Sequence, residues 1–183
     1  MLKLTLISMM LSCVIWAETT NVSLLIDTSG SMKGKESEIK SFVFKVMKEQ
    51  KDMDIFLFNN DVKKVDKNKP LKIYPKGGTN LSYALSKVAN DDTKAIILIT
   101  DGEPSSPKRV LKEVEKLKAK KTVICSSFIG NNSRRPEILE KISDVFLVNE
   151  SLKGSLDECL SNAKIKKVLQ PSYEEKIKPK YKF

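Results

Sequence analysis

Short, continuous apolar runs alternate with amphipathic segments along most of this sequence, and this alternation limits the fold more than any other feature. The runs are rich in Ile, Val, Leu and Phe, as expected for strands that are buried on both faces of a sheet. The predicted strands are Val22–Ile26, Asp54–Phe58, Leu71–Tyr74, Ala95–Thr100, Thr122–Phe128 and Val145–Val148. Leu71–Tyr74 is the weakest of them and is expected at an edge of the sheet.

Between these runs the apolar residues recur at helical spacing. Two longer helices are predicted from the sets Ile39, Phe42, Val43, Val46, Met47 and Val110, Leu111, Val114, Leu117. Ser106 and Pro107 begin the second as a cap and a first-turn proline. Shorter helices are predicted over Leu81–Val88 and Pro136–Ile142. A last helix is predicted from Ser155 to about Leu169, because Ser155 and Glu158 have the spacing of a capping box.

Strands that alternate with helices predict an α/β fold, namely a doubly wound, mostly parallel sheet of about six strands with helices on both faces, in a Rossmann-like arrangement. A chain of 183 residues has the size of one domain. We expect that domain to occupy residues 18–170. Residues 171–183 form a polar, lysine-rich tail.

The first 17 residues have the pattern of a secretory signal peptide. Lys3 precedes an apolar stretch from Leu4 to Trp16, and Ala17 ends it with a small residue. The stretch is too short to span a bilayer comfortably, so we expect export to the periplasm or the medium, with no membrane span after cleavage. An uncleaved anchor and a lipid on Cys13 are the alternatives.

The basic composition points to a solvated surface rather than to nucleic-acid recognition. The formal charge is +10, but only three of the 33 basic residues are arginine. Arginine is the usual residue for bidentate contacts with bases and phosphates, so sequence-specific nucleic-acid binding is not expected. The lysines would instead steer the chain toward an acidic partner.

Oxygen-bearing side chains and glycines gather in three loops of the predicted fold. Asp27-Thr28-Ser29-Gly30-Ser31 follows the first strand, Gly77-Gly78-Thr79-Asn80 precedes a helix, and Asp101-Gly102-Glu103-Pro104 follows another strand. In an open α/β sheet, ligands bind beyond the carboxyl ends of the strands, where the strand order reverses. We therefore expect these loops to meet.

The side chains in these loops predict a hard cation. The sequence has no histidine, and Cys125 and Cys159 lie outside the three loops, which excludes a typical zinc or copper site. Asp27, Ser29 and Ser31 alternate along one loop, so their oxygens can turn toward one point. With Thr79 and Asp101 they offer three hydroxyls and two carboxylates, and waters would complete the six oxygens that Mg²⁺ prefers.

These elements resemble the von Willebrand factor type A (VWA) domain and its metal-ion-dependent adhesion site. The family's D-x-S-x-S element matches Asp27, Ser29 and Ser31, its threonine matches Thr79, and its distant aspartate matches Asp101. The resemblance covers roughly residues 21–169. It implies a doubly wound fold, binding of Mg²⁺ or Mn²⁺, and recognition of an Asp or Glu side chain of a partner protein at an open metal position. A shift of the last helix on ligand binding is a further implication.

An enzyme is the first alternative. Leu24–Gly30 is similar to an element of aspartic proteases, but Ser29 separates Thr28 from Gly30, and those proteases are mostly β. No P-loop or histidine is present to serve phosphoryl or acid–base chemistry. We therefore expect a binding protein rather than an enzyme.

Two further alternatives are non-catalytic. The chain could be an interaction module that no longer uses a metal, although all five expected ligands are present. Its basic residues, among them Lys108, Arg109, Lys112 and Lys116, could bind an anionic surface.

Two features depend on the compartment. After signal cleavage Cys125 and Cys159 remain, and in an oxidising compartment they could pair or stay as buried thiols. Asn80 begins one of four Asn-x-Ser sequences. A glycan there would crowd Thr79, which favours a bacterial exported protein.

Overall fold

The computed structural model describes residues 21–89, 93–162 and 164–166 of the chain. The predicted signal peptide at 1–17, Cys13 and the predicted tail at 171–183 lie outside these residues. No helix in the described part is long and apolar enough to cross a membrane.

One six-stranded sheet forms the centre of the molecule, and its strand order is β3-β2-β1-β4-β5-β6. The strands are β1 (Asn21–Asp27), β2 (Asp54–Phe58), β3 (Val62–Lys64), β4 (Thr93–Thr100), β5 (Val123–Ile129) and β6 (Val145–Asn149). All neighbouring pairs are parallel except β2 and β3, which are antiparallel. The predicted doubly wound, mostly parallel α/β sheet is therefore confirmed.

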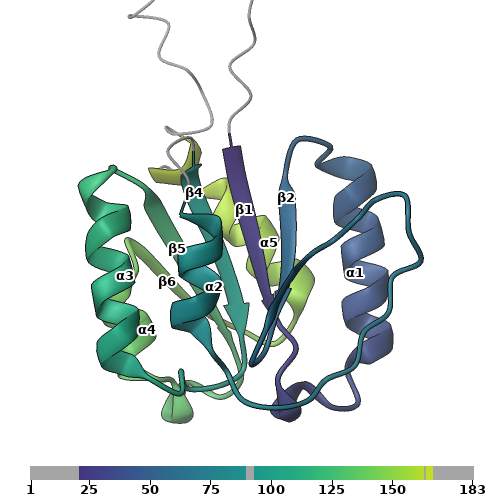
Figure 1. Ribbon diagram of the computed structural model, residues 1–183, viewed down its shortest axis with the longest axis horizontal. Coiled ribbons are helices and arrows are strands. Elements are labelled where there is room, and N and C mark those ends of the chain that lie inside the picture. The colour runs from purple at the N-terminus through teal and green to yellow at the C-terminus, as the bar shows by residue number, and fades with distance from the viewer. Residues whose placement is uncertain (1–20, 90–92, 163, 167–183) are drawn as a thin grey trace, which may run out of the picture.

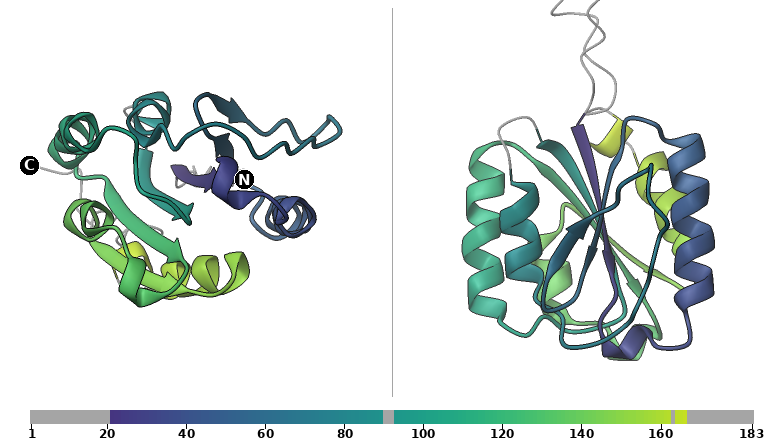
Figure 2. Two further views of the ribbon diagram at one scale, coloured as in Figure 1. Left: turned by 90° about the horizontal axis from the view of Figure 1, so that it is seen from below. Right: turned by 45° about the vertical axis from the view of Figure 1, so that its right-hand side comes forward.

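Helices cover both faces of the sheet (Figures 1 and 2). The helices are α1 (Glu36–Glu49), α2 (Leu81–Val88), α3 (Pro107–Ala119), α4 (Glu137–Ile142) and α5 (Leu152–Ser161). Two 3-10 turns, η1 (Gly30–Met32) and η2 (Asn132–Arg134), lie in the loops. α1 and α5 pack on one face, and α2, α3 and α4 pack on the other.

The continuous apolar runs are explained by this double cover. In β4, Ile97 and Ile99 belong to the core cluster under α1 and α5, whereas Ile96 and Leu98 belong to the cluster under α2, α3 and α4. All four side chains have 0% exposure. Successive residues of a strand point to opposite faces, so a strand that is covered on both sides needs apolar residues at every position.

The predicted strand Leu71–Tyr74 is wrong, and the edge strand is β3 instead. Leu71 and Ile73 are partly buried against the core, so their alternation reflects packing of a loop without ladder hydrogen bonds. Pro70 and Pro75 flank the segment and cannot donate to a ladder. β3 escaped prediction because it has only three residues, two of which are exposed lysines.

The predicted start of the last helix is also wrong. α5 begins at Leu152, and the Ser151 hydroxyl caps it by accepting a 3.1 Å hydrogen bond from the Gly154 N–H. Ser155 lies inside the helix, where its side chain is fully buried. Glu158 forms no capping box, because its carboxylate accepts a 3.1 Å bond from the Asn149 amide. α5 ends at Ser161, and 164–166 form a further helical turn.

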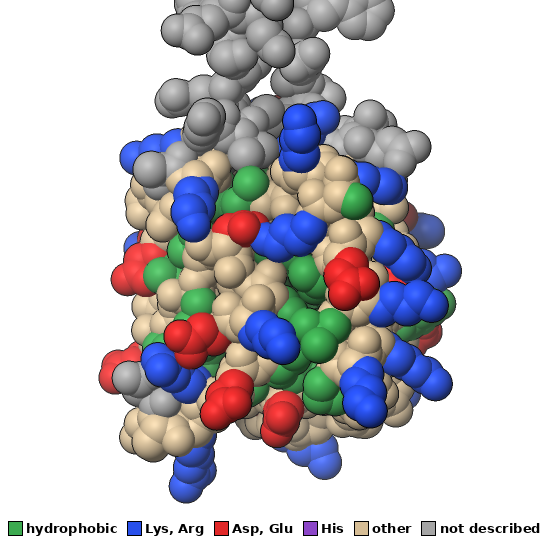
Figure 3. Space-filling view, turned by 90° about the vertical axis from the view of Figure 1, so that its left-hand side faces the viewer, with side chains coloured by type: hydrophobic (Ala, Val, Ile, Leu, Met, Phe, Trp, Pro, Cys, Tyr) green, Lys and Arg blue, Asp and Glu red, His purple; other side chains and the backbone are tan. Residues whose placement is uncertain are grey.

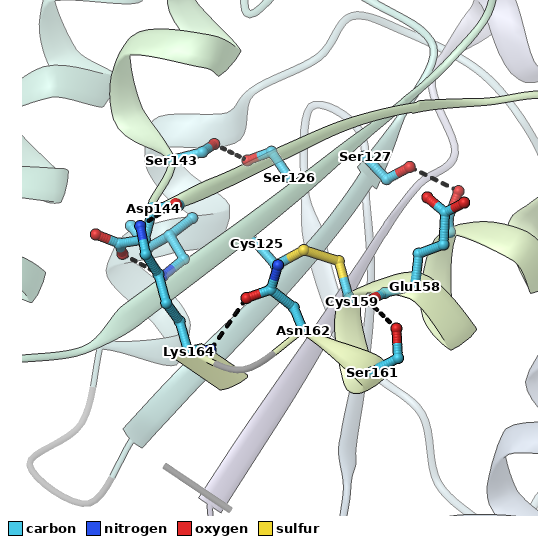
Figure 4. The surroundings of a disulfide bond; sticks show 12 residues. Cys125, Ser126, Ser127, Ser143, Asp144, Glu158, Cys159, Ser161, Asn162 and Lys164 are labelled. Atoms are coloured by element: carbon cyan, nitrogen blue, oxygen red, sulfur yellow. Dashed lines mark hydrogen bonds between the residues drawn. A yellow bond between two sulfur atoms is a disulfide. The ribbon is translucent and has the colours of Figure 1, made fainter. Parts of the chain in front are cut away.

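Cys125 and Cys159 are joined by a disulfide bond between β5 and α5 (Figure 4). Their Cα atoms are 6.0 Å apart, and both side chains have 0% exposure. The two cysteines can reach each other because α5 packs on the face of the sheet to which the Cys125 side chain points. Close by, the buried Ser127 hydroxyl donates a 2.7 Å bond to Ser155, so covalent and polar contacts both hold α5 against the sheet.

Candidate metal centre

The predicted ligand loops meet where the strand order reverses. β1 and β4 are neighbours in the sheet although α1, β2, β3 and α2 lie between them in the sequence. α1 follows β1 on one face of the sheet, and α3 follows β4 on the other. The loops after Asp27 and Thr100 therefore start side by side at the carboxyl edge and lead to opposite faces. This is the position at which open α/β sheets bind ligands.

Asp27 is held rigidly at the end of β1. The Ser29 N–H donates a 2.7 Å hydrogen bond to one carboxylate oxygen, and the Thr100 hydroxyl donates a 2.5 Å bond to the other. The side chain is buried, with 0% exposure. Burial raises the pKa of Asp27 above its ordinary value; the bonds from Thr100 and Ser29 oppose this rise, and the nearby Asp101 charge adds to it.

Hydroxyl contacts connect Ser29, Ser31 and Asp101. The Ser29 and Ser31 hydroxyl oxygens are 3.0 Å apart, and the Ser31 hydroxyl donates a 2.7 Å bond to Asp101 Oδ1. The 3-10 turn η1 begins at Gly30 and brings Ser31 back over the end of the sheet. The first and third predicted loops are therefore joined directly through their side chains.

Gly102 shows that the oxygens converge on one point. A Cβ atom built on Gly102 would lie 3.2 Å from Thr79 Oγ1, 3.7 Å from Ser31 Oγ and 3.9 Å from Asp27 Oδ2. Three ligand atoms from three separate segments thus surround a space that is free of side chains only because residue 102 is glycine. Ser29 and Asp101 join these three groups through their contacts with the Ser31 hydroxyl. Together the five side chains offer two carboxylates and three hydroxyls, a donor set that fits a hard divalent cation.

The loop that carries Thr79 is fixed by backbone hydrogen bonds. The Gly30 N–H donates to the Gly77 carbonyl at 2.9 Å, and the Ser105 N–H donates to the Thr79 carbonyl at 3.0 Å. Gly77 has φ +70°, and an added Cβ would lie 2.6 Å from the Asn60 amide nitrogen. This position therefore requires glycine for both conformation and space.

Exposure rises from one side of the site to the other. Asp27, Ser29 and Thr79 are buried, whereas Ser31 is exposed and the Asp101 side chain is 10% exposed. The site is thus closed toward the sheet and open toward solvent beside Ser31 and Asp101. Within the described residues, no three His, Cys, Asp or Glu side chains gather at one point. Neutral hydroxyls therefore make up most of the donor set.

Three residues that support the site were not singled out from the sequence. Thr100 orients the Asp27 carboxylate, and Asn60 accepts a 2.8 Å bond from the Gly78 N–H. Lys35 Nζ lies 3.8 Å from Asp101 Oδ2. Thr100 stands next to Asp101 in the sequence, and that adjacency could have indicated its role. Lys35 and Asn60 carry no such signal, because their places depend on the tertiary fold.

Known proteins resemble this chain in fold but not detectably in sequence family. No protein-family model and no curated protein sequence matches the chain. Among solved structures, the manganese-loaded TRAP protein of Plasmodium vivax superposes with a TM-score of 0.57 and 19% identity, over 81% of this chain and 74% of that chain. Proximal thread matrix protein 1 from the mussel byssus superposes with a TM-score of 0.59 and 21% identity, over 82% of this chain and 46% of that chain.

Both of these proteins contain von Willebrand factor type A domains. The fold of this chain is a VWA fold. At identities of 19% and 21% the likeness extends to the fold alone. In this chain the candidate metal centre lies at the carboxyl edge of β1 and β4. The chain spans less than half of the mussel protein, so the likeness concerns one part of that molecule.

Charges alternate on the side of the VWA fold that carries α3 and α4. Figure 3 shows basic and acidic side chains interspersed over this side rather than a single basic patch. Lys116 pairs with Glu113 at 2.8 Å, and Arg135 pairs with Glu140 at 3.4 Å. Such pairing reduces the local positive potential that an anionic polymer would need.

Proposed function

We propose that this VWA-fold chain is a protein-interaction module that binds Mg²⁺ or Mn²⁺ through Asp27, Ser29, Ser31, Thr79 and Asp101. The observation that carries the proposal is the convergence of Thr79, Ser31 and Asp27 around Gly102. The burial of Asp27 supports it further. A buried carboxylate is costly without a compensating cation, and the hydrogen bonds to this one in the described structure come from the neutral Ser29 N–H and Thr100 hydroxyl.

We propose further that the site grips an Asp or Glu side chain of a partner protein. A divalent cation bound there would keep much of its positive charge, since hydroxyls are neutral and only two carboxylates offset it. The open side of the site, beside Ser31 and Asp101, is where a carboxylate from outside could enter. Lysine or amide side chains would be poor substitutes, because neither brings a negative oxygen.

Binding rather than catalysis is the proposed activity. The whole sequence lacks histidine, and the Asp27 loop lies on a parallel α/β sheet rather than on the β fold of aspartic proteases. We also propose that the protein is exported. The apolar stretch from Leu4 to Trp16 and the disulfide between Cys125 and Cys159 both support an oxidising destination. Amino-terminal sequencing of the mature protein would test cleavage after Ala17.

Calorimetric titration with MgCl₂ and MnCl₂ tests the metal site. The parent protein should bind one cation, and Asp101→Asn should lose most of the affinity because a neutral amide replaces a ligand carboxylate. Asp157→Asn is the matched control, since Asp157 is an exposed aspartate on α5, away from the site. Equal affinity of the parent and Asp101→Asn would refute the ligand assignment.

A pull-down from the native source tests the interaction. Capture of a partner should occur with Mg²⁺ and fail with EDTA, and Asp101→Asn should fail where Asp157→Asn succeeds. Neutralising one acidic residue of the captured protein should also abolish binding. Full capture in EDTA would refute the metal-dependent grip and would favour a metal-independent surface.

A further inference from the structure

Lys35 is anchored immediately beside the candidate metal centre. It occupies the position before the first residue of α1 and follows Gly34, whose φ of +87° turns the chain. The Lys35 N–H donates a 3.1 Å bond to the Met32 carbonyl, and its own carbonyl accepts a 2.9 Å bond from the Ile39 N–H. The side chain thus starts from a fixed point between the Ser31 turn and the helix.

The ammonium group of Lys35 faces Asp101. Its Nζ atom lies 3.8 Å from Asp101 Oδ2, while Asp101 Oδ1 accepts the hydrogen bond from Ser31. The two side chains are 33% and 10% exposed, so the pair is partly shielded from water. Both oxygens of this predicted ligand carboxylate therefore have side-chain partners within the protein.

Lys35 differs from the lysine nearest to it in the loop. Lys33 is exposed and makes no ion pair with any described residue. The other described lysine ion pairs involve acidic residues outside the site, such as Asp54 and Asp66. In the described part of the chain, the contact with a predicted metal ligand belongs to Lys35.

We propose that Lys35 is a resident counter-ion of Asp101 that competes with the divalent cation and so sets the affinity of the site for metal. This inference rests on the proposed function. The ammonium neutralises a carboxylate that the cation needs, and it repels the cation as well. Repulsion between a single and a double charge about 6 Å apart in a water-like medium corresponds to roughly tenfold in affinity.

Three variants separate this role from a general effect of charge. Lys35→Gln removes the ammonium, Lys35→Arg keeps the positive charge, and Lys33→Gln removes an equal charge from the same loop. Titration with MgCl₂ and MnCl₂ in low salt should show a roughly tenfold rise in affinity for Lys35→Gln. Lys35→Arg should remain within about twofold of the parent, and Lys33→Gln should raise the affinity clearly less than Lys35→Gln does, because the Lys33 charge makes no contact with Asp101. Added NaCl should shrink the difference, since the effect is electrostatic.

Thermal melting in EDTA checks that each variant is folded, and Lys35→Met replaces Lys35→Gln if the latter melts early. If Lys35→Gln binds the cations no more tightly than the parent does, the proposed role of Lys35 is wrong, but the assignment of the metal site is unaffected. An equal rise in Lys33→Gln would overturn the specific contact in favour of bulk charge. A parent protein that binds neither cation would overturn the proposed function and this inference together.

Discussion

The Ser31 hydroxyl donates a 2.7 Å hydrogen bond to Asp101 Oδ1, and this contact joins two loops that are 70 residues apart in the sequence. The contact follows from the strand order, because β1 and β4 are paired in parallel and their carboxyl ends lie side by side. A single hydrogen bond thus positions a predicted hydroxyl ligand and a predicted carboxylate ligand relative to each other.

Ser31→Ala should therefore weaken metal binding more than the loss of one metal ligand would by itself. The substitution removes a hydroxyl oxygen from the donor set and also leaves Asp101 without its hydrogen-bonded partner. We expect a fall in Mg²⁺ affinity of roughly tenfold or more, because one charge-assisted hydrogen bond is worth about 1.5–3 kcal/mol. Calorimetry measures the change, with Ser161→Ala, an exposed serine at the end of α5, as control. Unchanged affinity would remove Ser31 from the site.

Gly102→Ala should block the site without unfolding the protein. Gly102 does not have a positive φ, so alanine is compatible with its backbone. The new Cβ would lie 3.2 Å from Thr79 Oγ1 and would fill the space that the ligand oxygens surround. We expect a melting temperature in EDTA close to that of the parent, together with loss of the Mg²⁺-induced rise in melting temperature. An undiminished rise would place the cation elsewhere.

The sequence predicted the parts of the fold that depend on continuous burial. Ile96–Ile99 and Leu24–Ile26 are apolar at every position because helices cover both faces of the central strands. The edge of the sheet could not be predicted in the same way. β3 is short and half-exposed, and it owes its conformation to pairing with β2. Leu71 and Ile73 resemble a strand because they pack on the core, although no ladder forms there.

The candidate site was predicted as a set of ligand types but not as a set of interactions. Asp27, Ser29, Ser31, Thr79 and Asp101 stand in recognisable local patterns, and the structure brings them together. The contact between Lys35 and Asp101 has no local pattern. It depends on where the first turn of α1 meets the loop after β4, and that distance exists only in the folded chain.

Asp144 should make stability depend on pH in acid. Burial raises the pKa of Asp144, but the Lys118 ammonium and the 2.8 Å bond from the Ile124 N–H outweigh it, and the net pKa is lowered from 3.8. A lowered folded pKa stabilises the fold above the unfolded pKa, and this stabilisation is lost as pH falls through the folded pKa. The side chain is 31% exposed, so we expect at most about 1 kcal/mol.

Urea unfolding of the parent and Asp144→Asn from pH 7 down to pH 3 tests this expectation. The difference in unfolding free energy should be constant near neutrality and should shrink below about pH 4, where aspartate in the unfolded chain begins to protonate. Taking the difference in unfolding free energy between the parent and the variant cancels the pH-dependent contributions of the other carboxylates. A difference that stays constant into acid would show that the ion pair with Lys118 is not its source.

The disulfide between Cys125 and Cys159 should be the largest single contribution to stability that a reagent can remove. It closes a loop with a sequence separation of 34 residues. By the chain-entropy estimate, a loop of this length stabilises the fold by about 3–4 kcal/mol, because it restricts the unfolded chain. Reduction should therefore lower the midpoint of urea unfolding. Mass spectrometry of the non-reduced protein should show a mass lower by two hydrogens.

The Cys125→Ala/Cys159→Ala variant provides the control for this prediction. It should unfold at a lower urea concentration than the oxidised parent, and reductant should not change its midpoint. Its native state also loses two buried sulfur atoms, so the reduced parent is the better measure of the bond itself.

The disulfide bond ties α5 to β5, and the candidate metal ligands lie on other elements. Metal affinity should therefore persist in the reduced parent at urea concentrations where it stays folded. Loss of Mg²⁺ binding on reduction alone, with melting behaviour unchanged, would show that the position of α5 controls the site.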